Sequence, residues 1–417
     1  MSLASDKQQK LQQSLQNLPR PLDLQKELYR GSVKNLYQVG FAQNPDSSFL
    51  LFEFTDDYSV FDWGKMPDPI PQKGFGLSKL AQFFFQKLGD AKEWQGFLQT
   101  SATQQAIEEL KKNNSPESVQ KTTDQLSKSG LDSHYLKNHN QELLTANNQD
   151  PFLFVSPVQV FSPAPAQCGP FAYFNYDHAK SQMGSSDKSF LIPLEVVFRF
   201  ELGEGSSFLK RHPDSPFKAG HRFTVPYVEF FTKLEPQDRS LSLSEAQQIS
   251  GLSIEQFNQL YLKNVFTCLF LKSLFASKNI NLVDGKLEWA LATGQDNSAE
   301  KNIILVDAIG PDELRLEYQN FQLSKEVLRK YYRYTSWYQD FEKFKMQNPS
   351  IEKKHHAELP QPPPLSKDFL NLMTNMYKSL SNTITGENIF DSPSLEKIVQ
   401  DLKQKMIELS TQSKGAL

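Results

Sequence analysis

A segment near the middle of the chain combines an apolar strand pattern with charges that suit an anionic ligand. Residues 192–200 alternate with a period of two, and positions 192, 194, 196, 198 and 200 form an unbroken apolar face. The other face carries Glu195 and Arg199. The strand then enters a glycine- and serine-rich turn that ends at Lys210 and Arg211. Charges of both signs, followed by a glycine–hydroxyl–lysine turn, predict an anion-binding site here.

A second strand pattern, at residues 282–289, puts three charged residues on one face: Asp284, Lys286 and Glu288. Such charges are expensive to bury without a ligand or partner charges. Asp307 lies among apolar residues of the next strand, and a hairpin of the two strands would bring it towards Glu288. Paired carboxylates suit Mg²⁺, which prefers oxygen ligands and usually holds phosphates as well. The alternative is a solvated sheet face with exchangeable salt bridges.

A third pattern, Tyr29-Arg-Gly-Ser-Val-Lys34, sets a glycine turn beside a lysine, as in loops that cover nucleotide phosphates. By itself this pattern favours an ordinary tight turn with a surface lysine. The sequence has no Walker-type loop, no dinucleotide fingerprint, no Cys/His cluster typical of zinc and no nucleophile elbow of a serine hydrolase.

The elements that must position these residues are a mixture of strands and helices. Strand patterns at 28–37 and 49–54 are expected to pair across a turn at 43–46. Further strands are expected at 280–291 and 303–309. Apolar residues at helical spacing predict helices at 76–88, 253–278, 366–383 and 393–411. Strands early and late with helices between predict the α+β (mixed α/β) class.

The length of 417 residues allows two or three lobes. Composition changes along the chain predict their order: a polar lead-in over 1–25, a β-rich lobe over 26–190 with a helical insert at 91–129 and a loop-rich insert at 162–188, an α/β lobe over 191–345, a proline-rich spacer over 346–365, and C-terminal helices over 366–417.

The bulk composition limits the partners and the compartment. A formal net charge of −3 argues against a general nucleic-acid binder, which needs a basic surface. The two cysteines, Cys168 and Cys268, are too few for a disulfide framework and fit a reducing compartment. No apolar run approaches the roughly 20 residues of a membrane span, and the N-terminus lacks the apolar core of a signal peptide. We therefore expect a cytoplasmic protein without a nucleic-acid or membrane partner.

Taken together, these segments resemble the SAICAR synthetase family of de novo purine biosynthesis. The strongest matches are Ile192-Pro-Leu-Glu-Val-Val-x-Arg199, Val228-Glu-Phe-Phe-x-Lys233, Leu282-Val-Asp-x-Lys-Leu-Glu288, and Asp307 with Pro311-Asp312 and Arg315. Other matches are Leu28-Tyr-Arg-Gly-x-x-Lys34, Ser59-x-x-Asp62 with Lys73-Gly74, and Gly130-Leu-x-Ser-His134. The matches follow the family's order over most of residues 28–386.

The resemblance implies an ATP-dependent ligase that joins the carboxylate of CAIR to the amine of L-aspartate and yields SAICAR, ADP and phosphate through an acyl phosphate. It implies ATP and Mg²⁺ as cofactors, and a monomer or homo-oligomer. The implied fold is a small antiparallel β-sheet lobe for ATP, a larger α/β lobe and C-terminal helices.

The resemblance also implies roles for particular residues. The expected catalytic residues are Lys34, Asp284 and Lys286. Those expected at ATP are Arg30, Gly31, Lys34, Glu195, Glu288 and Asp307, of which Glu288 and Asp307 would hold the metal. Those expected at CAIR are Asp62, Arg199, Gly205, Ser206, Ser207, Lys210, Lys286, Asp312 and Arg315. Candidates for the aspartate pocket are Lys233 and Asp238, with Asp62 as a third.

Several positions depart from the family pattern. Ser32 replaces the usual first lysine of Gly-Lys-x-Lys, and Phe200 stands where a polar residue is common. The path to Gly205 and Ser206 is longer than usual, which leaves open whether Ser206 or Ser207 contacts the phosphate. An alternative reading is therefore a catalytically reduced homologue that binds a nucleotide or purine intermediate without turnover. A protein that uses its charged sheet faces only for interaction is a third reading.

Overall fold

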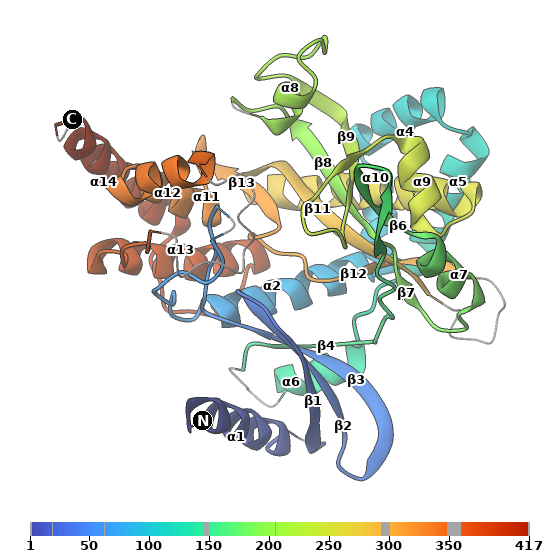
Figure 1. Cartoon of the computed structure of the whole chain (residues 1–417), viewed down its shortest axis with the longest axis horizontal. Coiled ribbons are helices and arrows are strands. Elements are labelled where there is room, and N and C mark those ends of the chain that lie inside the picture. Colours follow the sequence, from blue (N-terminus) through green and yellow to red (C-terminus); the bar gives the residue numbers. More distant parts are fainter. Residues whose placement is uncertain are drawn as a thin grey trace. The chain divides into compact units, whose positions relative to one another are not determined.

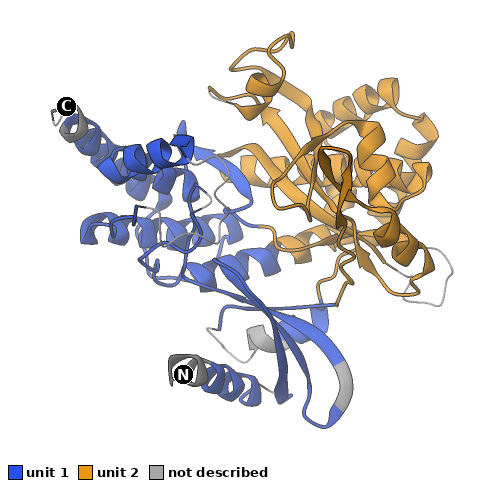
Figure 2. Ribbon diagram, viewed as in Figure 1, with its two compact units in different colours: residues 1–83, 136–156, 310–417 blue, residues 84–135, 157–309 orange. Residues whose placement is uncertain are grey.

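The computed structural model describes residues 2–18, 20–61, 63–145, 150–204, 206–292, 301–347 and 360–415. For residues 2–7, 45–47, 142–145 and 412–415 it describes the backbone only. The chain forms two compact units (Figure 2). Unit 1 comprises Met1–Phe83, Leu136–Ser156 and Gly310–Leu417, and unit 2 comprises Phe84–Tyr135 and Pro157–Ile309.

Unit 1 contains a four-stranded antiparallel sheet in the order β1 (Leu22–Arg30), β2 (Lys34–Phe41), β3 (Asn44–Phe54) and β4 (Phe152–Val155) (Figure 1). Helix α1 (Ser2–Gln16) packs on this sheet, and the shared core includes Leu11, Leu15, Val39 and Leu51. The lead-in is therefore helical and is joined to the sheet by apolar contacts.

The sequence prediction of a single strand over 28–37 is wrong, because a tight turn divides this segment into the end of β1 and the start of β2. The Gly31 N–H donates to the carbonyl of Lys34 at 2.9 Å. A Cβ on residue 31 would lie 2.6 Å from that carbonyl oxygen, so only glycine fits this turn. The turn predicted at 43–46 lies at 42–43, since β3 begins at Asn44.

The remainder of unit 1 is mainly helical. Its elements are α2 (Lys73–Leu88), whose last turn passes into unit 2, α6 (Lys137–Thr145), the hairpin β13 (Leu314–Tyr318) and β14 (Phe321–Gln322), α11 (Lys325–Arg333), α12 (Ser336–Gln347), α13 (Lys367–Thr385) and α14 (Leu395–Gly415). Stacking of Tyr331 on Phe369, with centroids 4.2 Å apart, joins α11 to α13. The predicted helices at 76–88, 366–383 and 393–411 are confirmed within a few residues at each end.

Unit 2 is built on a sheet in which β10 (Ser240–Leu241), β9 (Arg222–Thr232), β8 (Leu194–Glu201) and β11 (Ile280–Ala292) lie side by side, all antiparallel. Strands β12 (Asn302–Val306) and β7 (Phe190–Leu191) also pair with β11. Helix α10 (Ile254–Ala276) covers the apolar face: the ring of Phe257 lies 5.1 Å from that of Phe230, and Trp289 Nε1 donates to Asn264 Oδ1 at 3.1 Å.

The apolar alternation of residues 194–200 predicts a core-facing strand surface, and this is confirmed. Leu194, Val196, Phe198 and Phe200 are all at most 2% exposed. The predicted helix at 253–278 corresponds to α10, and the predicted strand at 280–291 corresponds to β11. The predicted strand at 303–309 corresponds to β12, but β12 ends at Val306, so Asp307 lies after the strand and not within it. The sequence therefore located the central elements of this unit correctly.

The two inserts contribute further structure to unit 2. Residues 91–129 form α3 (Ala91–Leu98), α4 (Ser101–Asn113) and α5 (Pro116–Ser129), each preceded by a side-chain cap from Asp90, Thr100 or Ser115. Residues 162–188 form the hairpin of β5 (Ala164–Cys168) and β6 (Phe171–Asn175), followed by α7 (Asp177–Ser185). The remaining helices are α8 (Ser207–Arg211) and α9 (Leu243–Ser250). In the ranges given above, no helix is long and apolar enough to cross a membrane.

Candidate functional site

The face of the unit 2 sheet opposite the buried apolar residues carries a set of charged side chains. Cross-strand pairing aligns Arg199 with Asp284, and Val197 with both Lys286 and Glu229. Because paired residues on adjacent strands project to the same side, β8, β9 and β11 place these charges together. The two charged strands predicted from the sequence are thus neighbours, and β9 adds an acid to them.

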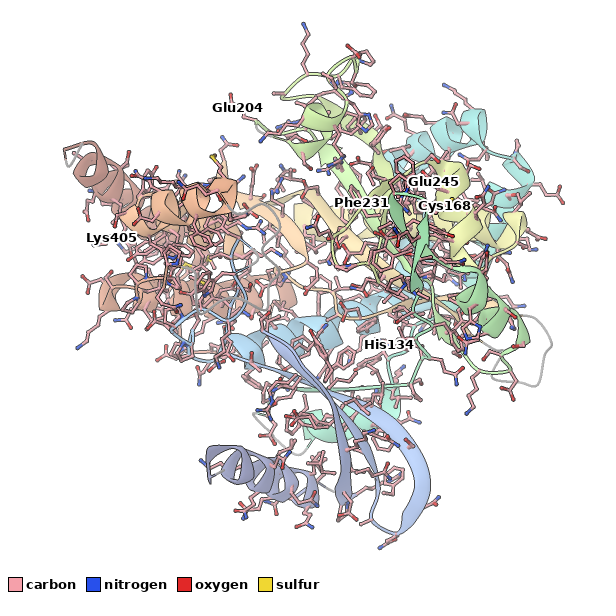
Figure 3. All side chains as sticks on the ribbon, in the orientation of Figure 1. His134, Cys168, Glu204, Phe231, Glu245 and Lys405 are labelled. Carbon is pink, nitrogen blue, oxygen red and sulfur yellow. The ribbon has the colours of Figure 1, made fainter. Side chains whose placement is uncertain are left out.

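Arg199 is the centre of the first cluster on this face. Its guanidinium donates from Nε to Glu229 Oε2 at 2.6 Å and from Nη1 to Asp284 Oδ2 at 3.3 Å. Nη2 donates to Ser207 Oγ at 3.3 Å. Arg211 also pairs with Glu229, through its other carboxylate oxygen, and lies over the ring of Phe231, which is labelled in Figure 3. Two guanidinium groups are therefore fixed by carboxylates that are themselves buried.

The turn after β8 carries two serines, of which Ser207 contacts Arg199. Ser206 is the N-cap residue of the short helix α8, and its hydroxyl makes no capping bond. That hydroxyl is buried and has no hydrogen-bond partner among the residues that the structure describes. A buried, unsatisfied hydroxyl costs about 1–3 kcal/mol, which a ligand acceptor would recover. Lys210 lies on α8 itself, whereas Gly205 lies outside the described residues.

A second cluster, formed by two lysines and two glutamates, lies on the same sheet. Glu195 Oε1 accepts from Lys286 Nζ at 2.6 Å and from Lys233 Nζ at 3.2 Å. Lys233 Nζ also donates to Glu288 Oε1 at 2.6 Å. The carboxylates are buried, while the side chains of Lys233 and Lys286 are 25% and 36% exposed. The cluster therefore turns its positive charges outwards over a buried acidic layer.

The pKa values in this second cluster follow from competition between burial and charge. Burial would raise the pKa of Glu195, but Lys286 and Lys233 hold it below its usual range. Burial would lower the pKa of Lys233, but Glu288, Glu195 and Asp307 raise it above its usual range. Lys286 behaves in the same way, chiefly through Glu195. Both lysines thus stay protonated at neutral pH and available to anions.

Glu288 differs from Glu195, because its pKa is raised. The first cause is burial, and the second is the negative charge of Asp307, which Lys233 and Lys286 only partly offset. Asp307 directly follows β12, one residue beyond the register partner of Glu288. In the described part of the chain there is no group of three or more His, Cys, Asp or Glu that could hold a metal ion. Two repelling carboxylates nevertheless fit Mg²⁺, which takes one or two protein carboxylates and completes its shell with water and phosphate oxygens.

In unit 1, the structure places the predicted nucleotide-loop residues at one end of the sheet. Lys34 starts β2 and its Nζ lies 4.9 Å from the centroid of Phe52 and 6.0 Å from that of Phe54. Arg30 ends β1 and pairs with Glu27 at 2.7 Å. The Gly31 turn lies between them. This arrangement presents a lysine beside a backbone turn and two aromatic rings.

Asp312, expected at CAIR, lies in a buried network of unit 1. Its Oδ2 pairs with Lys73 Nζ at 2.9 Å, and its Oδ1 accepts from the hydroxyl of Tyr377 on α13 at 2.7 Å. Burial would raise the pKa of Asp312, but Lys73, Lys325 and Tyr377 hold it below its usual range. Arg315 follows on β13, three residues later. The protein itself thus occupies both oxygens of Asp312.

The structure divides the predicted residues between the two units. Unit 1 contains Arg30, Gly31, Lys34, Asp312 and Arg315, and unit 2 contains Glu195, Arg199, Ser206, Ser207, Lys210, Lys233, Asp238, Asp284, Lys286, Glu288 and Asp307. Asp238 is exposed in the loop before β10, and Asp62 lies outside the described residues.

Sequence reasoning missed several residues that contact predicted ones, among them Glu229, Lys73, His134, Tyr377 and Glu27. Glu229 had a signal, because its position in the Val228-Glu-Phe-Phe run puts it on the polar face of a strand. Lys73 and His134 also lie in matched runs, but their partners are far away in the sequence, so no local pattern identifies them.

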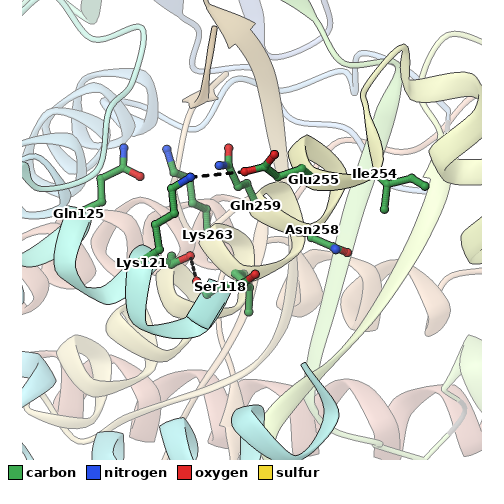
Figure 4. A pocket seen from close by; sticks show the side chains of 10 residues that line it. Ser118, Lys121, Gln125, Ile254, Glu255, Asn258, Gln259 and Lys263 are labelled. Carbon is green, nitrogen blue, oxygen red and sulfur yellow. Dashed lines mark hydrogen bonds and ion pairs between the residues drawn. The ribbon is translucent and has the colours of Figure 1, made fainter. Parts of the chain in front are cut away.

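Unit 2 also contains a cavity of about 340 Å³ between α5 and α10 (Figure 4). Ser118, Lys121 and Gln125 line one wall, and Glu255 and Lys263 line the other. Lys263 is buried and donates to Asn302 Oδ1 at 2.7 Å and to the carbonyl of Ile303 at 2.8 Å. Burial lowers its pKa to about 8, against a weaker opposing effect of Asp132. None of the residues lining this cavity belongs to the predicted site.

The fold is that of an α+β protein, and a sheet face with ordered guanidinium, ammonium and carboxylate groups is of the kind that enzymes use for anionic substrates. The SAICAR synthetase family model matches residues 27–344, which is most of the chain. The chain belongs to the SAICAR synthetase family, a family of ATP-dependent ligases.

Curated relatives agree with the family match. A protein of Archaeoglobus fulgidus, provisionally named phosphoribosylaminoimidazole-succinocarboxamide synthase, is 33% identical over 393 residues, which cover 90% of this chain and 99% of the relative. The phosphoribosylaminoimidazole-succinocarboxamide synthase of Thermoplasma volcanium is 26% identical over 386 residues, covering 87% of this chain and 99% of the relative.

Among solved structures, the SAICAR synthase of Saccharomyces cerevisiae, complexed with SAICAR, matches with a TM-score of 0.48 and 19% identity over 90% of this chain and 97% of that chain. A type-2 SAICAR synthetase in complex with ADP matches with a TM-score of 0.47 and 20% identity over 88% of this chain and 100% of that chain.

Proposed function

We propose that this protein ligates L-aspartate to the carboxylate of CAIR at the expense of ATP, giving SAICAR, ADP and phosphate. The observation that carries the proposal is the charged face of the unit 2 sheet. There, Arg199 and Lys286 are held by the buried carboxylates of Glu229, Asp284 and Glu195. Membership of the SAICAR synthetase family supplies the reaction, and the charged face supplies the residue types that it needs.

CAIR carries a phosphate and a carboxylate, and we assign its binding to the cations and hydroxyls of this face. Arg199 and Lys286 contribute charge, and the guanidinium suits bidentate contact with either anion. The unsatisfied hydroxyl of Ser206 is the first phosphate contact, and Ser207 stays engaged with Arg199. Asp284 orients Arg199 through their 3.3 Å contact.

Further residues of each unit are also assigned to CAIR. Lys210, on α8, and the backbone of Gly205 extend the phosphate contacts in unit 2. Arg315 and Asp312, in unit 1, are assigned to CAIR in different roles. Arg315 contributes charge directly, whereas Asp312 acts by holding its segment in place, because Lys73 and Tyr377 occupy its carboxylate oxygens.

ATP is assigned to the Gly31 turn, Lys34 and the carboxylate pair. Lys34, with Arg30 nearby, would neutralise phosphate charge, and Glu288 and Asp307 would hold the Mg²⁺ that accompanies ATP. When bound, the cation supplies charge neutralisation and polarisation of phosphate oxygens. Glu195 supports this arrangement by fixing Lys286 and Lys233.

The chemistry requires activation of a carboxylate, because a carboxylate resists attack by an amine. In the proposed sequence, an oxygen of the CAIR carboxylate attacks the γ-phosphorus and ADP leaves, which forms an acyl phosphate. The aspartate amine then attacks the acyl carbon, and phosphate departs with the C–O bond electrons as the amine loses a proton. Lys34 and Lys286 stabilise the negative charge that develops on the transferred group.

The aspartate pocket is assigned to Lys233 and Asp238, with Asp62 as a further candidate. Lys233 is the better supported, because it remains protonated and partly exposed beside the other assigned residues. We further propose a cytoplasmic monomer or homo-oligomer. The second candidate function, ligand binding without turnover, is favoured by Ser32, which replaces a lysine in the nucleotide turn.

The test is ADP formation by the purified full-length protein with CAIR, ATP and Mg²⁺, with and without L-aspartate. The ligase proposal predicts ADP release that depends on aspartate and equals SAICAR formed. Binding of ATP and CAIR without aspartate-dependent ADP would instead support the homologue that does not turn over. Absence of both binding and turnover would overturn the two readings together.

A further inference from the structure

The backbone at Asp307 adopts an unusual conformation. Its φ angle is +63°, in the left-handed region that non-glycine residues seldom occupy, although aspartate is among the more tolerant types. Holding a residue in this conformation costs of order 1–3 kcal/mol, so the conformation persists only where its surroundings fix it. The residue is also one of the two proposed metal ligands, so its orientation matters to function.

The segment of residues 132–134 lies along β12 and reaches the point where Asp307 leaves the strand. The Leu305 N–H donates to the carbonyl of Asp132 at 3.0 Å, and the His134 N–H donates to the carbonyl of Leu305 at 3.1 Å. Ser133 and Leu305 form a parallel bridge. These contacts fix the backbone of His134, which is labelled in Figure 3, relative to the end of β12.

The imidazole of His134 continues this contact to Asp307. Its Nε2 lies 2.8 Å from the carbonyl oxygen of Asp307. A carbonyl can only accept, so Nε2 carries the proton and donates. The ring is buried and tilted against Phe85 at a centroid distance of 5.6 Å, which limits its rotation. The carbonyl of Asp307, whose backbone is left-handed, thus accepts a hydrogen bond from the side chain of His134, 173 positions earlier in the chain.

We propose that His134 is a positioning residue for the metal pair: its Nε2–H holds the Asp307 backbone so that the Asp307 carboxylate faces Glu288. This inference rests on the proposed function, because it acts through the two carboxylates assigned to Mg²⁺. Glu288 and Asp307 carry like charges, and the negative charge of Asp307 raises the pKa of Glu288, so the two carboxylates repel each other. A side-chain clamp on the backbone opposes that repulsion, and such supporting contacts typically change metal affinity by about 10–100-fold.

The competing explanation is a purely structural histidine that satisfies a buried carbonyl. The two explanations predict different effects of removing the hydrogen bond between His134 and the Asp307 carbonyl. If the role is structural, loss of the hydrogen bond lowers the free energy of unfolding and leaves the cation affinity of the folded protein unchanged. If His134 positions Asp307, loss of the hydrogen bond also lowers the cation affinity of the folded protein, beyond any change in stability.

The experiment compares three full-length variants. His134→Gln keeps an amide N–H near the position of Nε2, whereas His134→Asn is too short to reach it, and His134→Leu removes the donor at similar volume. Binding of Mn²⁺ in the presence of ADP is measured by electron paramagnetic resonance, so no turnover is needed, and thermal unfolding is measured alongside.

We expect the Mn²⁺ dissociation constant to rise about 10-fold or more in His134→Asn and His134→Leu and to stay within about 3-fold of wild type in His134→Gln. If His134→Leu fails to fold, the Asn and Gln variants decide the question. Wild-type affinity in His134→Asn overturns the positioning role, and so does an equal loss in the Asn and Gln variants.

Asp307→Asn separates this inference from the proposed function. That substitution keeps the backbone contact to His134 but removes the charge, and we expect it to weaken Mn²⁺ binding strongly. If wild type binds Mn²⁺ and Asp307→Asn binds it equally well, the metal pair is misassigned and the role of His134 falls with it. If Asp307→Asn fails to bind while His134→Asn and His134→Leu bind normally, only the role of His134 is overturned.

Discussion

Each unit contains a group of ion-paired lysine and carboxylate side chains, and the two groups differ in how far their lysines are exposed. In unit 1, Lys73 is fully buried and pairs with Asp312, which Tyr377 also contacts, while Lys73 Nζ donates to the carbonyl of Asp57 at 3.1 Å. In unit 2, Lys233 and Lys286 are a quarter to a third exposed above buried glutamates. The first group is enclosed by the protein, and the second presents its cations at a surface.

This difference separates residues that hold the structure from residues that can bind a ligand. An enclosed pair that meets its hydrogen-bonding requirements internally contributes to the fold, and removing one partner leaves an isolated buried charge. A partly exposed ammonium over a buried carboxylate stays charged and can still donate to an incoming anion. The comparison therefore predicts opposite effects of mutation on stability and on turnover.

The largest expected effect is on turnover in unit 2. Arg199→Ala and Asp307→Ala should each lower the rate of aspartate-dependent ADP formation by on the order of 10²–10³-fold, because Arg199 is assigned to the binding of CAIR and Asp307 to the Mg²⁺ that would polarise the phosphate oxygens. Steady-state kinetics and circular dichroism measure rate and fold. Arg222→Ala is the matched control, since Arg222 is an exposed arginine on the adjacent strand β9 that pairs with Glu201. Near-normal rates in Arg199→Ala and Asp307→Ala would show that the site is misassigned.

The next effect is on stability in unit 1. Lys73→Met should lower the free energy of unfolding by about 3–5 kcal/mol, because it leaves Asp312 buried without its ion-pair partner. Urea unfolding measures this change. Lys397→Met, which breaks an exposed pair with Asp401, is the control and should cost less than about 1 kcal/mol. Lys286→Met should likewise change stability by about 1 kcal/mol or less; a loss as large as that of Lys73→Met would remove the distinction between the two groups.

A third kind of lysine sharpens the comparison. Lys263 is buried and contacts uncharged acceptors, and its pKa falls from 10.5 to about 8. Below pH 8 both the folded and unfolded states carry the proton, so the cost of burial is present in full. Between pH 8 and 10.5 the folded state loses its proton first, so stability should rise with pH by up to about 3 kcal/mol relative to Lys263→Met.

Unfolding experiments at pH 7 to 10.5 test this, with Lys121→Met as the control at an exposed neighbouring lysine. The difference between wild type and Lys121→Met should stay constant across this range. If the difference in the free energy of unfolding between wild type and Lys263→Met does not change with pH, Lys263 keeps its proton over this range. Its surroundings would then stabilise the charged lysine as well as those of Lys73 do in unit 1.

The smallest expected effect is at the third member of the enclosed group. Tyr377→Phe removes the hydroxyl that donates to Asp312 and should lower the free energy of unfolding by about 1–2 kcal/mol. Tyr29→Phe, at an exposed tyrosine of unit 1, should be neutral. No change in Tyr377→Phe would mean that Lys73 alone accounts for the stability of this group.

Much of the fold was predictable because it depends on local patterns. Strict alternation over residues 194–200 identified β8 and its buried face, and helical spacing identified α10 and α13. The tight turn at Gly31 was predicted, but residues 28–37 were still assigned to one strand, because apolar residues lie on both sides of the turn. The loop-rich insert at 162–188 contains a hairpin and a helix, whose polar and small residues gave little periodicity.

The sequence by itself determined the family, the class of fold, and which residue types occur on which strand faces, because period and motif order are properties of the chain alone. Only the tertiary structure decided which of these side chains come into contact. Glu229 pairs with Arg199, Lys233 joins Glu195 to Glu288, and Lys73 pairs with Asp312. His134 contacts the carbonyl of Asp307. The physical reason is that strand order and register set these contacts. Interactions across tens to hundreds of residues leave no periodic signal in the sequence.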